Sequence, residues 1–415
     1  MRVRQLAWSA FACAALGCGT KAPTTVGDAT TADAFVPGID AYEDSDGDGI
    51  SDGTEGRYDP GGPRDTDGDG APDAKDPDSD NDGVTDLDEG VADWDGDGVP
   101  NYVDPFNDGP PPAIQLVAIS TTFNSPIGID YHSPTNSVVM SVNYPSGAPS
   151  NLERIEANGD HQPFSTFGGL TDEVKIATVR PGNMGGFTPG ELFVGNGVDG
   201  QIVRVSADGS TFQNPWVDLT GDNNGLMRGS LYVDRTGLYG GDLFVVTTTG
   251  QLWRITSAGA ATKLADVTGV HLEGLFIVPN VPVRYGPLAG KILAGAEAQH
   301  LLYAFDATGA YQTYAVGVDI EDIEVVPAHE NFFGVNFGSS RLLGATAEDF
   351  QPMVGDVLLT QEVVATGAVG LYRLQWDGTA LSAQELTLKP DSATVAQWEH
   401  TTLAPAGIVE IPPIN

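Results

Sequence analysis

The sequence predicts a mostly β protein that divides into an aspartate-rich N-terminal segment and a larger glycine-rich region of short strands. Three observations predict this class. A twelve-residue aspartate pattern occurs four times between residues 44 and 104. Beyond residue 113, short β-branched and aromatic runs alternate with Gly, Asp and Asn, which is typical of all-β repeat architectures. Finally, no stretch has a sustained helical period of apolar residues.

Residues 1–18 resemble a bacterial lipoprotein signal. Arg2 and Arg4 precede an apolar run that is too short to span a bilayer, and a small residue lies just before Cys18. The resemblance implies that Cys18 is acylated and becomes the new first residue. We therefore expect an exported lipoprotein at the outer membrane or cell surface, with secretion as the alternative. Residues 19–42 are small and polar and predict a flexible linker.

The charge of the chain is concentrated in the aspartate-rich segment. The chain has 19 basic and 57 acidic residues and a net charge of −38. Residues 41–109 contribute 23 acidic and three basic side chains, a local net charge of −20. Nucleic acids and anionic membrane surfaces would repel such a segment, so we expect no nucleic-acid partner and membrane contact through the lipid anchor only.

The aspartate pattern has the spacing of calcium ligands. DSDGDGISDGTE begins at residue 44 and recurs as DTDGDGAPDAKD, DSDNDGVTDLDE and DWDGDGVPNYVD. Each copy has Asp at positions 1, 3 and 5, Gly at position 6, and acidic or amide residues at positions 9 and 12, as in the EF-hand loop. Ca²⁺ takes six to eight oxygen ligands, which such a loop can supply. The predicted Ca²⁺ ligands are Asp44, Asp46, Asp48, Asp52, Glu55, Asp65, Asp67, Asp69, Asp73, Asp76, Asp78, Asp80, Asp82, Asp86, Glu89, Asp93, Asp95, Asp97, Asn101 and Asp104.

No helical periodicity flanks these loops, and the segment resembles thrombospondin type 3 repeats. That family winds around a line of calcium ions with little regular secondary structure. The resemblance covers residues 44–108 and sets the boundaries of the predicted repeat domain at 43–108. The animal family carries cysteines that cross-link its units, whereas this segment has none, so its order is expected to depend more on the metal. The alternative is an acidic disordered linker.

The remaining residues, 113–415, predict a β-propeller. Six strand-like runs align, five of them ending in proline: IGIDYHSP, VKIATVRP, MRGSLYVD, LEGLFIVP, IEDIEVVP and WEHTTLAP. Most separations are close to the length of a four-stranded blade, but the last is 78 residues, which leaves one blade irregular or without a recognisable inner strand. Six blades are favoured over five or seven. The pattern resembles the NHL and gluconolactonase-like propellers. We expect AIQLVAIST (113–121) to complete a C-terminal blade and close the ring.

The same alignment predicts a ring of charged side chains where the inner strands start. Glu273, Glu321, Glu399, Arg228 and Lys175 occupy one column of it, and they are a possible channel site. Three converging carboxylates are able to bind a divalent cation, as the resemblance to gluconolactonase-like propellers implies. The alternative is a structural ring in which the basic residues neutralise the glutamates.

The sequence assigns no catalytic residues. It contains no G-x-S-x-G nucleophile motif, no H-E-x-x-H zinc motif and no phosphate-binding loop. The first functional reading is a calcium-binding surface protein, not an enzyme, that presents its propeller as a binding or adhesion platform for a protein or carbohydrate. The second is a metal-dependent, lactonase-like hydrolase that uses the propeller channel.

Overall fold

The computed structural model describes residues 43–106, 109–119, 122–145, 150–198, 200–219, 230–362 and 369–413. The predicted signal with Cys18, the predicted linker and Arg228 lie outside these ranges. Within them, no helix has both the length and the apolar character needed to cross a membrane.

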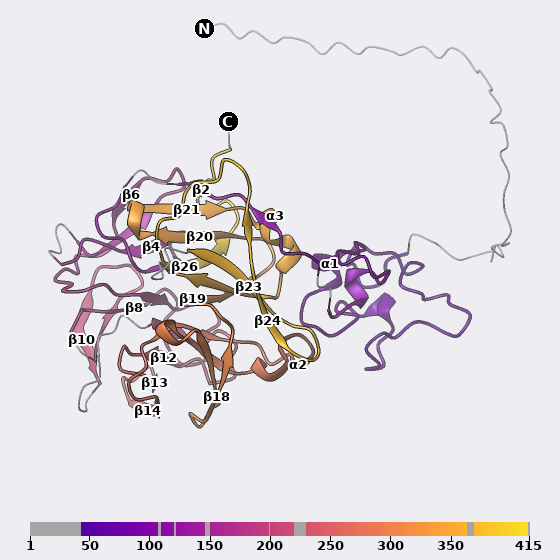
Figure 1. Cartoon of the computed structure of the whole chain (residues 1–415), viewed down its shortest axis with the longest axis horizontal. Coiled ribbons are helices and arrows are strands. Elements are labelled where there is room, and N and C mark those ends of the chain that lie inside the picture. Colours follow the sequence, from indigo (N-terminus) through magenta and orange to yellow (C-terminus); the bar gives the residue numbers. More distant parts are fainter. Residues whose placement is uncertain are drawn as a thin grey trace, which may run out of the picture. The chain divides into compact units, whose positions relative to one another are not determined.

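Six four-stranded sheets form the blades of a propeller (Figure 1). From the innermost strand outward, blades one to three are β3 (Ile129–His132), β4 (Ser137–Ser141), β5 (Leu152–Ile155) and β6 (His161–Pro163); β7 (Ile176–Thr178), β8 (Leu192–Gly195), β9 (Gln201–Val205) and β10 (Phe212–Asp218); β11 (Ser230–Val233), β12 (Leu243–Val246), β13 (Gln251–Ile255) and β14 (Ala261–Asp266). Blades four to six are β15 (Leu272–Ile277), β16 (Ile292–Ala296), β17 (Leu301–Phe305) and β18 (Tyr311–Ala315); β19 (Ile320–Val325), β22 (Val357–Gln361), β23 (Gly370–Trp376) and β24 (Leu381–Glu385); β26 (Trp398–Pro405), β20 (Glu330–Asn336), β21 (Arg341–Ala345) and β2 (Val117–Ala118).

The six inner strands are the six runs that the sequence alignment identified. They contact one another in ring order, β3 to β7, β11, β15, β19, β26 and back to β3. The prediction of a six-bladed, mostly β propeller is therefore confirmed. Short helical turns connect some strands: α2 (Pro282–Tyr285), η3 (Gly286–Leu288), η4 (Glu297–Gln299), η5 (Phe337–Ser339), α3 (Ala347–Phe350) and η6 (Gln351–Met353).

The long separation before the last inner strand has a specific cause. After β19 the chain leaves blade five, forms the β20–β21 hairpin of blade six, and then returns to blade five as β22–β24. Only afterwards does β26 enter blade six as its innermost strand, beside β20. All six blades therefore have an inner strand. In the sequence, the β20–β21 hairpin of blade six interrupts blade five between β19 and β22.

The ring closes with strands from both ends of the propeller region. β2 pairs antiparallel with β21, with Val117 opposite Gly344, in the sheet that contains β26 (Figure 1). The predicted closure by residues 113–121 is thereby confirmed for β2. The preceding β1 (Ala113–Ile114) instead pairs in parallel with β25 (Thr387–Leu388). Closure covers strand edges that would otherwise be open to pairing with other chains.

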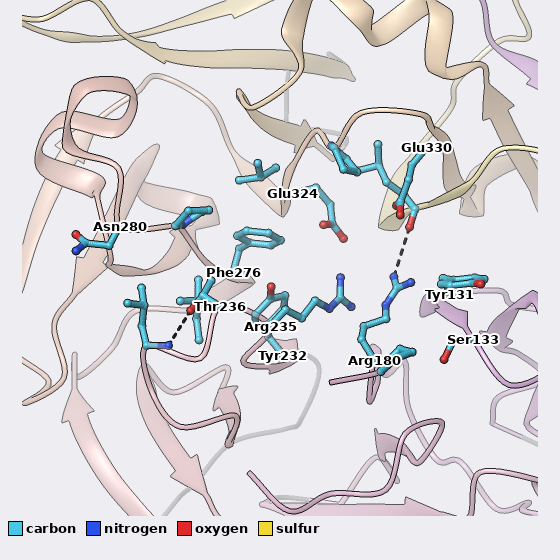
Figure 2. Close-up of a pocket in the computed structure, with 17 residues that line it drawn as sticks. Tyr131, Ser133, Arg180, Tyr232, Arg235, Thr236, Phe276, Asn280, Glu324 and Glu330 are labelled. Carbon is cyan, nitrogen blue, oxygen red and sulfur yellow. Dashed lines mark hydrogen bonds between the residues drawn. The ribbon is translucent and has the colours of Figure 1, made fainter. Parts of the chain in front are cut away.

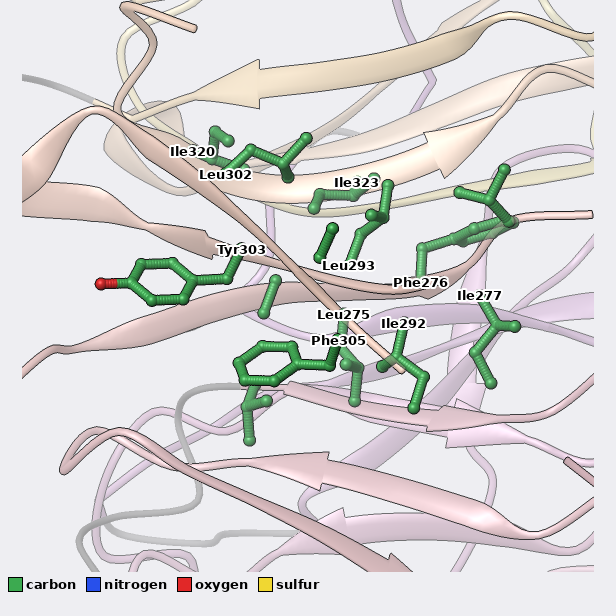
Figure 3. Close-up of a cluster of buried hydrophobic side chains, with 14 of the residues drawn as sticks. Leu275, Phe276, Ile277, Ile292, Leu293, Leu302, Tyr303, Phe305, Ile320 and Ile323 are labelled. Carbon is green, nitrogen blue, oxygen red and sulfur yellow. The ribbon is translucent and has the colours of Figure 1, made fainter. Parts of the chain in front are cut away.

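Apolar side chains fill the spaces between adjacent blades. Figure 3 shows one such layer, in which Leu293 and Leu302 of blade four pack with Ile323 of β19 in the next blade. The inner strands are buried along almost their whole length. Burial of this apolar area is the main stabilising contribution to a propeller without disulfides.

The aspartate-rich segment has little regular secondary structure. Its helical turns are η1 (Asp73–Lys75), α1 (Asp86–Glu89) and η2 (Asn101–Val103), each of which begins at position 9 of a twelve-residue loop. Its apolar cluster consists of Ile50, Tyr102 and Val103. Because so little apolar surface is buried here, the segment needs another source of order.

Replacing a buried aromatic residue of the inserted hairpin should destabilise the propeller. Phe332 on β20 is fully buried and packs edge-on against Trp398. Phe332→Ala is expected to cost about 3–5 kcal/mol of unfolding free energy, because it removes this contact and leaves a cavity. The matched control Phe212→Ala removes a ring that is 40% exposed and should cost far less. Chemical denaturation measures both; equal losses would contradict the packing described.

Candidate metal centre

The four aspartate loops begin at Asp44, Asp65, Asp78 and Asp93, and they share one set of backbone contacts. In the first loop, Asp44 accepts hydrogen bonds from the backbone N–H groups of Gly47 and Gly49 at 2.7 and 3.2 Å. Asp48 accepts from the N–H of Ile50 at 2.7 Å. The fourth loop repeats all three contacts, and the second and third loops repeat two of them each.

Glycine occupies all but one of the sharp turns of these loops; the exception is Asn81, which also has positive φ. Gly47 and Gly49 have φ angles of 87° and 91°, in the left-handed region that other residues rarely adopt. The corresponding glycines of the other loops also have positive φ. The glycines thus turn the backbone so that alternate carboxylates point to one side.

The side chain at position 9 of each loop accepts hydrogen bonds from the residue at position 2. Asp52 accepts hydrogen bonds from the backbone N–H and the hydroxyl of Ser45, both at 2.7 Å. Asp73 and Asp86 make the same pair of contacts to position 2 of their loops, and Asn101 accepts the backbone N–H of Trp94 at 3.2 Å. The sequence predicted these residues as ligands. The structure gives them a positioning role in addition, one that their residue type alone does not reveal.

The carboxylates at positions 1, 3 and 5 converge in every loop. In each, one oxygen from each of the three aspartates lies within 4.8 Å of the others. The four groups are Asp44, Asp46 and Asp48; Asp65, Asp67 and Asp69; Asp78, Asp80 and Asp82; Asp93, Asp95 and Asp97. A fifth group joins two loops, because Asp48 and Glu55 of the first loop meet Asp86 of the third.

Several of these carboxylates are buried without a protein partner. Both side-chain oxygens of Glu55 and of Asp46 lack a hydrogen-bond partner, and Glu55 is 0% exposed. One oxygen each of Asp48, Asp78 and Asp80 is in the same situation. Leaving a buried carboxylate oxygen unsatisfied is costly, so these oxygens fit a cation that they would surround.

Burial and mutual repulsion raise the pKa of the glutamates at position 12. Burial, followed by the charges of Asp48 and Asp46, raises the pKa of Glu55 to about 8. Burial and the charges of Asp82 and Asp80 raise the pKa of Glu89 to about 11. Burial also raises the pKa of Asp76 and Asp104, at position 12 of the other two loops. A bound divalent cation would reverse this preference by stabilising the ionised carboxylates.

The donor set fits a hard cation. It consists of carboxylate oxygens, with no cysteine or histidine among the predicted ligands, and such a set favours Ca²⁺ over Zn²⁺. Positions 1, 3, 5 and 12 would hold the ion, and position 7 would offer a main-chain carbonyl as in EF-hand loops. Bound Ca²⁺ would supply the positive charge that these buried oxygens lack.

The third loop also contacts the propeller. Arg284 on α2 is buried; its guanidinium contacts the Asp82 carboxylate and lies 3.8 Å from Glu89. The same guanidinium reaches Asp356 of the propeller at 3.3 Å. Nearby, the Gln351 side-chain amide donates to the Asp88 carbonyl at 2.6 Å. Sequence reasoning missed Arg284, because an isolated arginine in a connecting turn gives no signal of its partner.

The predicted channel ring forms around a lysine. Lys175 Nζ lies 2.7 Å from Glu321 Oε1 and 3.1 Å from Glu273 Oε2, and Lys175 is 2% exposed. Lys175 Nζ also donates to the Glu321 carbonyl at 2.7 Å. Glu399 is also buried, and its charge contributes to raising the pKa of Glu321. In this geometry the ammonium group occupies the place between the glutamates that a divalent ion would take, which favours a structural ring.

Charge pairing explains the acidity of the ring. Burial alone would raise the pKa of Glu273, but the neighbouring charge of Lys175 lowers it to about 2. The pKa of Glu321 is instead raised well above its usual range by burial and by the neighbouring Glu273. In blade one, the equivalent position is Gly128, where an added Cβ would lie only 2.8 Å from Ile176 N and Ser141 Oγ. Among the described residues, groups of three acidic or histidine ligands close enough for a metal occur only in the aspartate loops.

Comparison with known proteins finds distantly similar solved structures and no matching family. No protein-family model and no curated protein matches the chain. Similar solved structures include virginiamycin B lyase from Staphylococcus aureus, with 10% identity, a TM-score of 0.41, and coverage of 70% of this chain and 98% of that one. A gluconolactonase from Xanthomonas campestris has 14% identity, a TM-score of 0.39, and coverage of 69% and 88%. A chain of the nidogen–laminin complex has 11% identity, a TM-score of 0.37, and coverage of 70% and 98%.

Removing the lysine at the centre of the ring should be strongly destabilising. Lys175→Met leaves Glu273 and Glu321 buried without their counter-charge, and breaking a buried pair in this way typically costs about 3–5 kcal/mol. The control Lys263→Met removes an exposed pair with Asp266, worth roughly 0–1 kcal/mol. Denaturant unfolding of both variants is the measurement. If the Lys175 variant is as stable as the control, the ring does not depend on this pairing.

The metal-free segment should lose stability as the pH rises. Because the pKa of Glu55 is raised from 4.5 to about 8 in the folded state, its contribution is fully present below pH 4.5 and is lost on the way to pH 8. Hydrogen exchange of residues 43–106 in a chelator should therefore accelerate over this range beyond the intrinsic pH effect. Glu55→Gln should flatten the trend. A wild-type segment with no such pH dependence would contradict the repulsion described.

Proposed function

We propose that the chain is an exported calcium-binding surface protein in which Ca²⁺ orders the aspartate loops and the propeller serves as a binding or adhesion platform. One observation carries the proposal: buried carboxylate oxygens of Asp46, Glu55 and Asp80 lie in converging acidic groups and lack a protein partner. A divalent cation satisfies them, and its binding free energy then becomes folding free energy of the segment.

The arrangement of the loops supports a role for calcium in fixing the segment as a unit. The group of Asp48, Glu55 and Asp86 combines ligands from the first and third loops, so one ion there would tie distant parts of the segment together. In the metal-free segment this group would repel. We therefore propose thrombospondin type 3-like repeats that become rigid on binding calcium and carry the propeller. Acylation of Cys18 would anchor the chain to the membrane, and a protein or carbohydrate is the proposed partner.

The alternative of a lactonase-like hydrolase receives less support. It requires an accessible metal in the propeller channel, whereas Lys175 already pairs with Glu273 and Glu321 there. The likeness to a gluconolactonase structure is a likeness of fold. We propose that the ring is structural and that the propeller binds without catalysing.

Removing one buried ligand should weaken calcium binding. Calorimetric titration of the full chain with Ca²⁺ is expected to show affinities on the order of 10⁻⁴–10⁻³ M, as in extracellular modules. Glu55→Gln keeps the shape of the side chain but removes its charge and should weaken at least one site by roughly tenfold or more. The matched control Asp59→Asn alters an exposed carboxylate of the same segment and should bind as the unmodified chain does. A flat titration up to several millimolar, which spans the weak end of extracellular sites, would overturn the proposal.

A further inference from the structure

The opening of the propeller channel at the ends of the inner strands contains a cavity of about 670 Å³. Residues from the ends of all six inner strands line it, among them Tyr131, Arg180, Tyr232, Phe276, Glu324 and Leu403. Lys175 immediately precedes β7 and Arg180 follows it, so the cavity lies at the opposite end of the channel from the lysine-centred ring. The aligned column of charged residues lies at the strand starts, so the sequence did not predict this cavity at the strand ends.

Two arginines form the polar side of the cavity. Asp130 of β3 lies 3.1 Å from Arg180 Nη2 and 3.0 Å from Arg235 Nη2. Asp130 is itself fixed by the backbone N–H and hydroxyl of Thr178, at 2.7 and 2.9 Å. The adjacent guanidinium groups hold the pKa of Asp130 well below its usual range. One permanently charged carboxylate thus orients two guanidinium groups.

These contacts leave donors that face the cavity. Arg180 Nη2 also donates to the Leu403 carbonyl, but Nη1 of both arginines has no acceptor among the described residues. The side chains are 16% and 25% exposed, and Figure 2 shows both guanidinium groups bordering the open space. Asp130 and the two arginines together carry a net positive charge, and Glu330, whose pKa is raised by burial, lines the same cavity near Arg180.

Aromatic rings hold the two guanidinium groups in place. Arg180 lies over the ring of Tyr131 with 4.5 Å to the centroid, and Arg235 lies over Tyr232 at 5.0 Å. Such stacking fixes the orientation of a guanidinium group and leaves its edge free for a planar anion. Bidentate binding of a carboxylate uses that edge.

The remaining walls are mainly apolar. Phe276, Ile277, Val325 and Leu238 line the cavity together with three prolines. Glu324 also faces it (Figure 2), and burial raises its pKa well above the usual range. Pockets with apolar walls and a few fixed polar groups are typical of small-molecule sites.

We propose that this cavity binds a small organic carboxylate with a flat, apolar body. The carboxylate would accept hydrogen bonds from Arg180 and Arg235, and the body would lie against the aromatic and aliphatic walls. The inference rests on the proposed role of the propeller as a binding platform, and it names the class of ligand. It does not depend on calcium binding.

Calorimetry with the full chain tests the proposal with defined probes. Indole-3-acetate has the proposed chemistry; indole-3-acetamide lacks the charge, and tryptamine reverses it. We expect indole-3-acetate to bind with one site per chain and the amide at least tenfold more weakly, since hydrogen bonds to charged groups contribute about 1.5–3 kcal/mol. Equal binding of the amide, preference for tryptamine, or no binding of indole-3-acetate would overturn the proposal.

Two variants locate the binding. Arg180→Met should reduce affinity for indole-3-acetate tenfold or more, whereas Arg341→Ala, an exposed arginine of β21 outside the cavity, should not. Arg180 also holds Asp130, so a second variant leaves that network intact. Leu238 is 46% exposed at the cavity, and Leu238→Glu adds a negative charge that should weaken indole-3-acetate roughly tenfold and spare tryptamine. Unchanged affinity in Leu238→Glu would place the binding elsewhere.

The two proposals fail separately. Each titration is run in saturating calcium and in a chelator, beside a calcium titration of the same preparation. Binding of indole-3-acetate without any calcium isotherm removes the proposed calcium function and leaves the cavity. A calcium isotherm without binding of indole-3-acetate does the reverse.

Discussion

Repulsion among buried carboxylates is the constraint on which the N-terminal segment depends. Glu55 has no exposed surface and no protein partner for either oxygen, and Asp46 and Asp48 lie beside it. No side chain of the segment supplies a compensating charge to this group; Arg57 is directed to Asp52 and Glu43 instead. The small apolar cluster around Ile50 and Tyr102 is a weak source of order. An external cation is the simplest way to balance the charges, and it connects the acidic composition to a folded state.

In the propeller, buried carboxylates are neutralised by basic side chains of the propeller itself. At the strand-start opening, Lys175 neutralises two glutamates; at the strand-end opening, Asp130 orients two arginines. Both groups lie on or next to the inner strands, which the interblade apolar layers hold in place. One opening is thus filled by its own salt bridges, whereas the other retains unused donors beside a cavity. The strand-end opening therefore fits ligand binding better than does the ring that the sequence identified.

In the third loop, a basic side chain of the propeller neutralises carboxylates of the aspartate-rich segment. Arg284 contributes a permanent positive charge to Asp82 and Glu89, so the third loop is partly neutralised before any ion binds. The other loops receive no such contact from α2 among the described residues. Under the proposed calcium function, the third loop is therefore expected to be the one whose order depends least on calcium.

Local patterns made most of the fold predictable from the sequence. The strand-ending prolines and the Gly and Asp turns located all six inner strands, and the aspartate spacing located the acidic groups. The position of the blade-six strands β20 and β21, between two strands of blade five in the sequence, was not predictable, because the pattern of a strand does not encode which sheet it joins. Position 9 of the loops was predicted as a ligand without its second contact to Ser45 or Thr66. Arg180 and Arg235 escaped notice because their partner, Asp130, lies far away in sequence.

The calcium content of the purified protein shows whether the aspartate loops bind Ca²⁺. The full chain and a chain without residues 43–108 are equilibrated in calcium, separated from free ions, and analysed by elemental mass spectrometry before and after a chelator. We expect about four or more chelatable calcium ions in the full chain, one for each loop, and none in the shortened chain, whose ring is filled by Lys175. Equal calcium content in the two chains would contradict it.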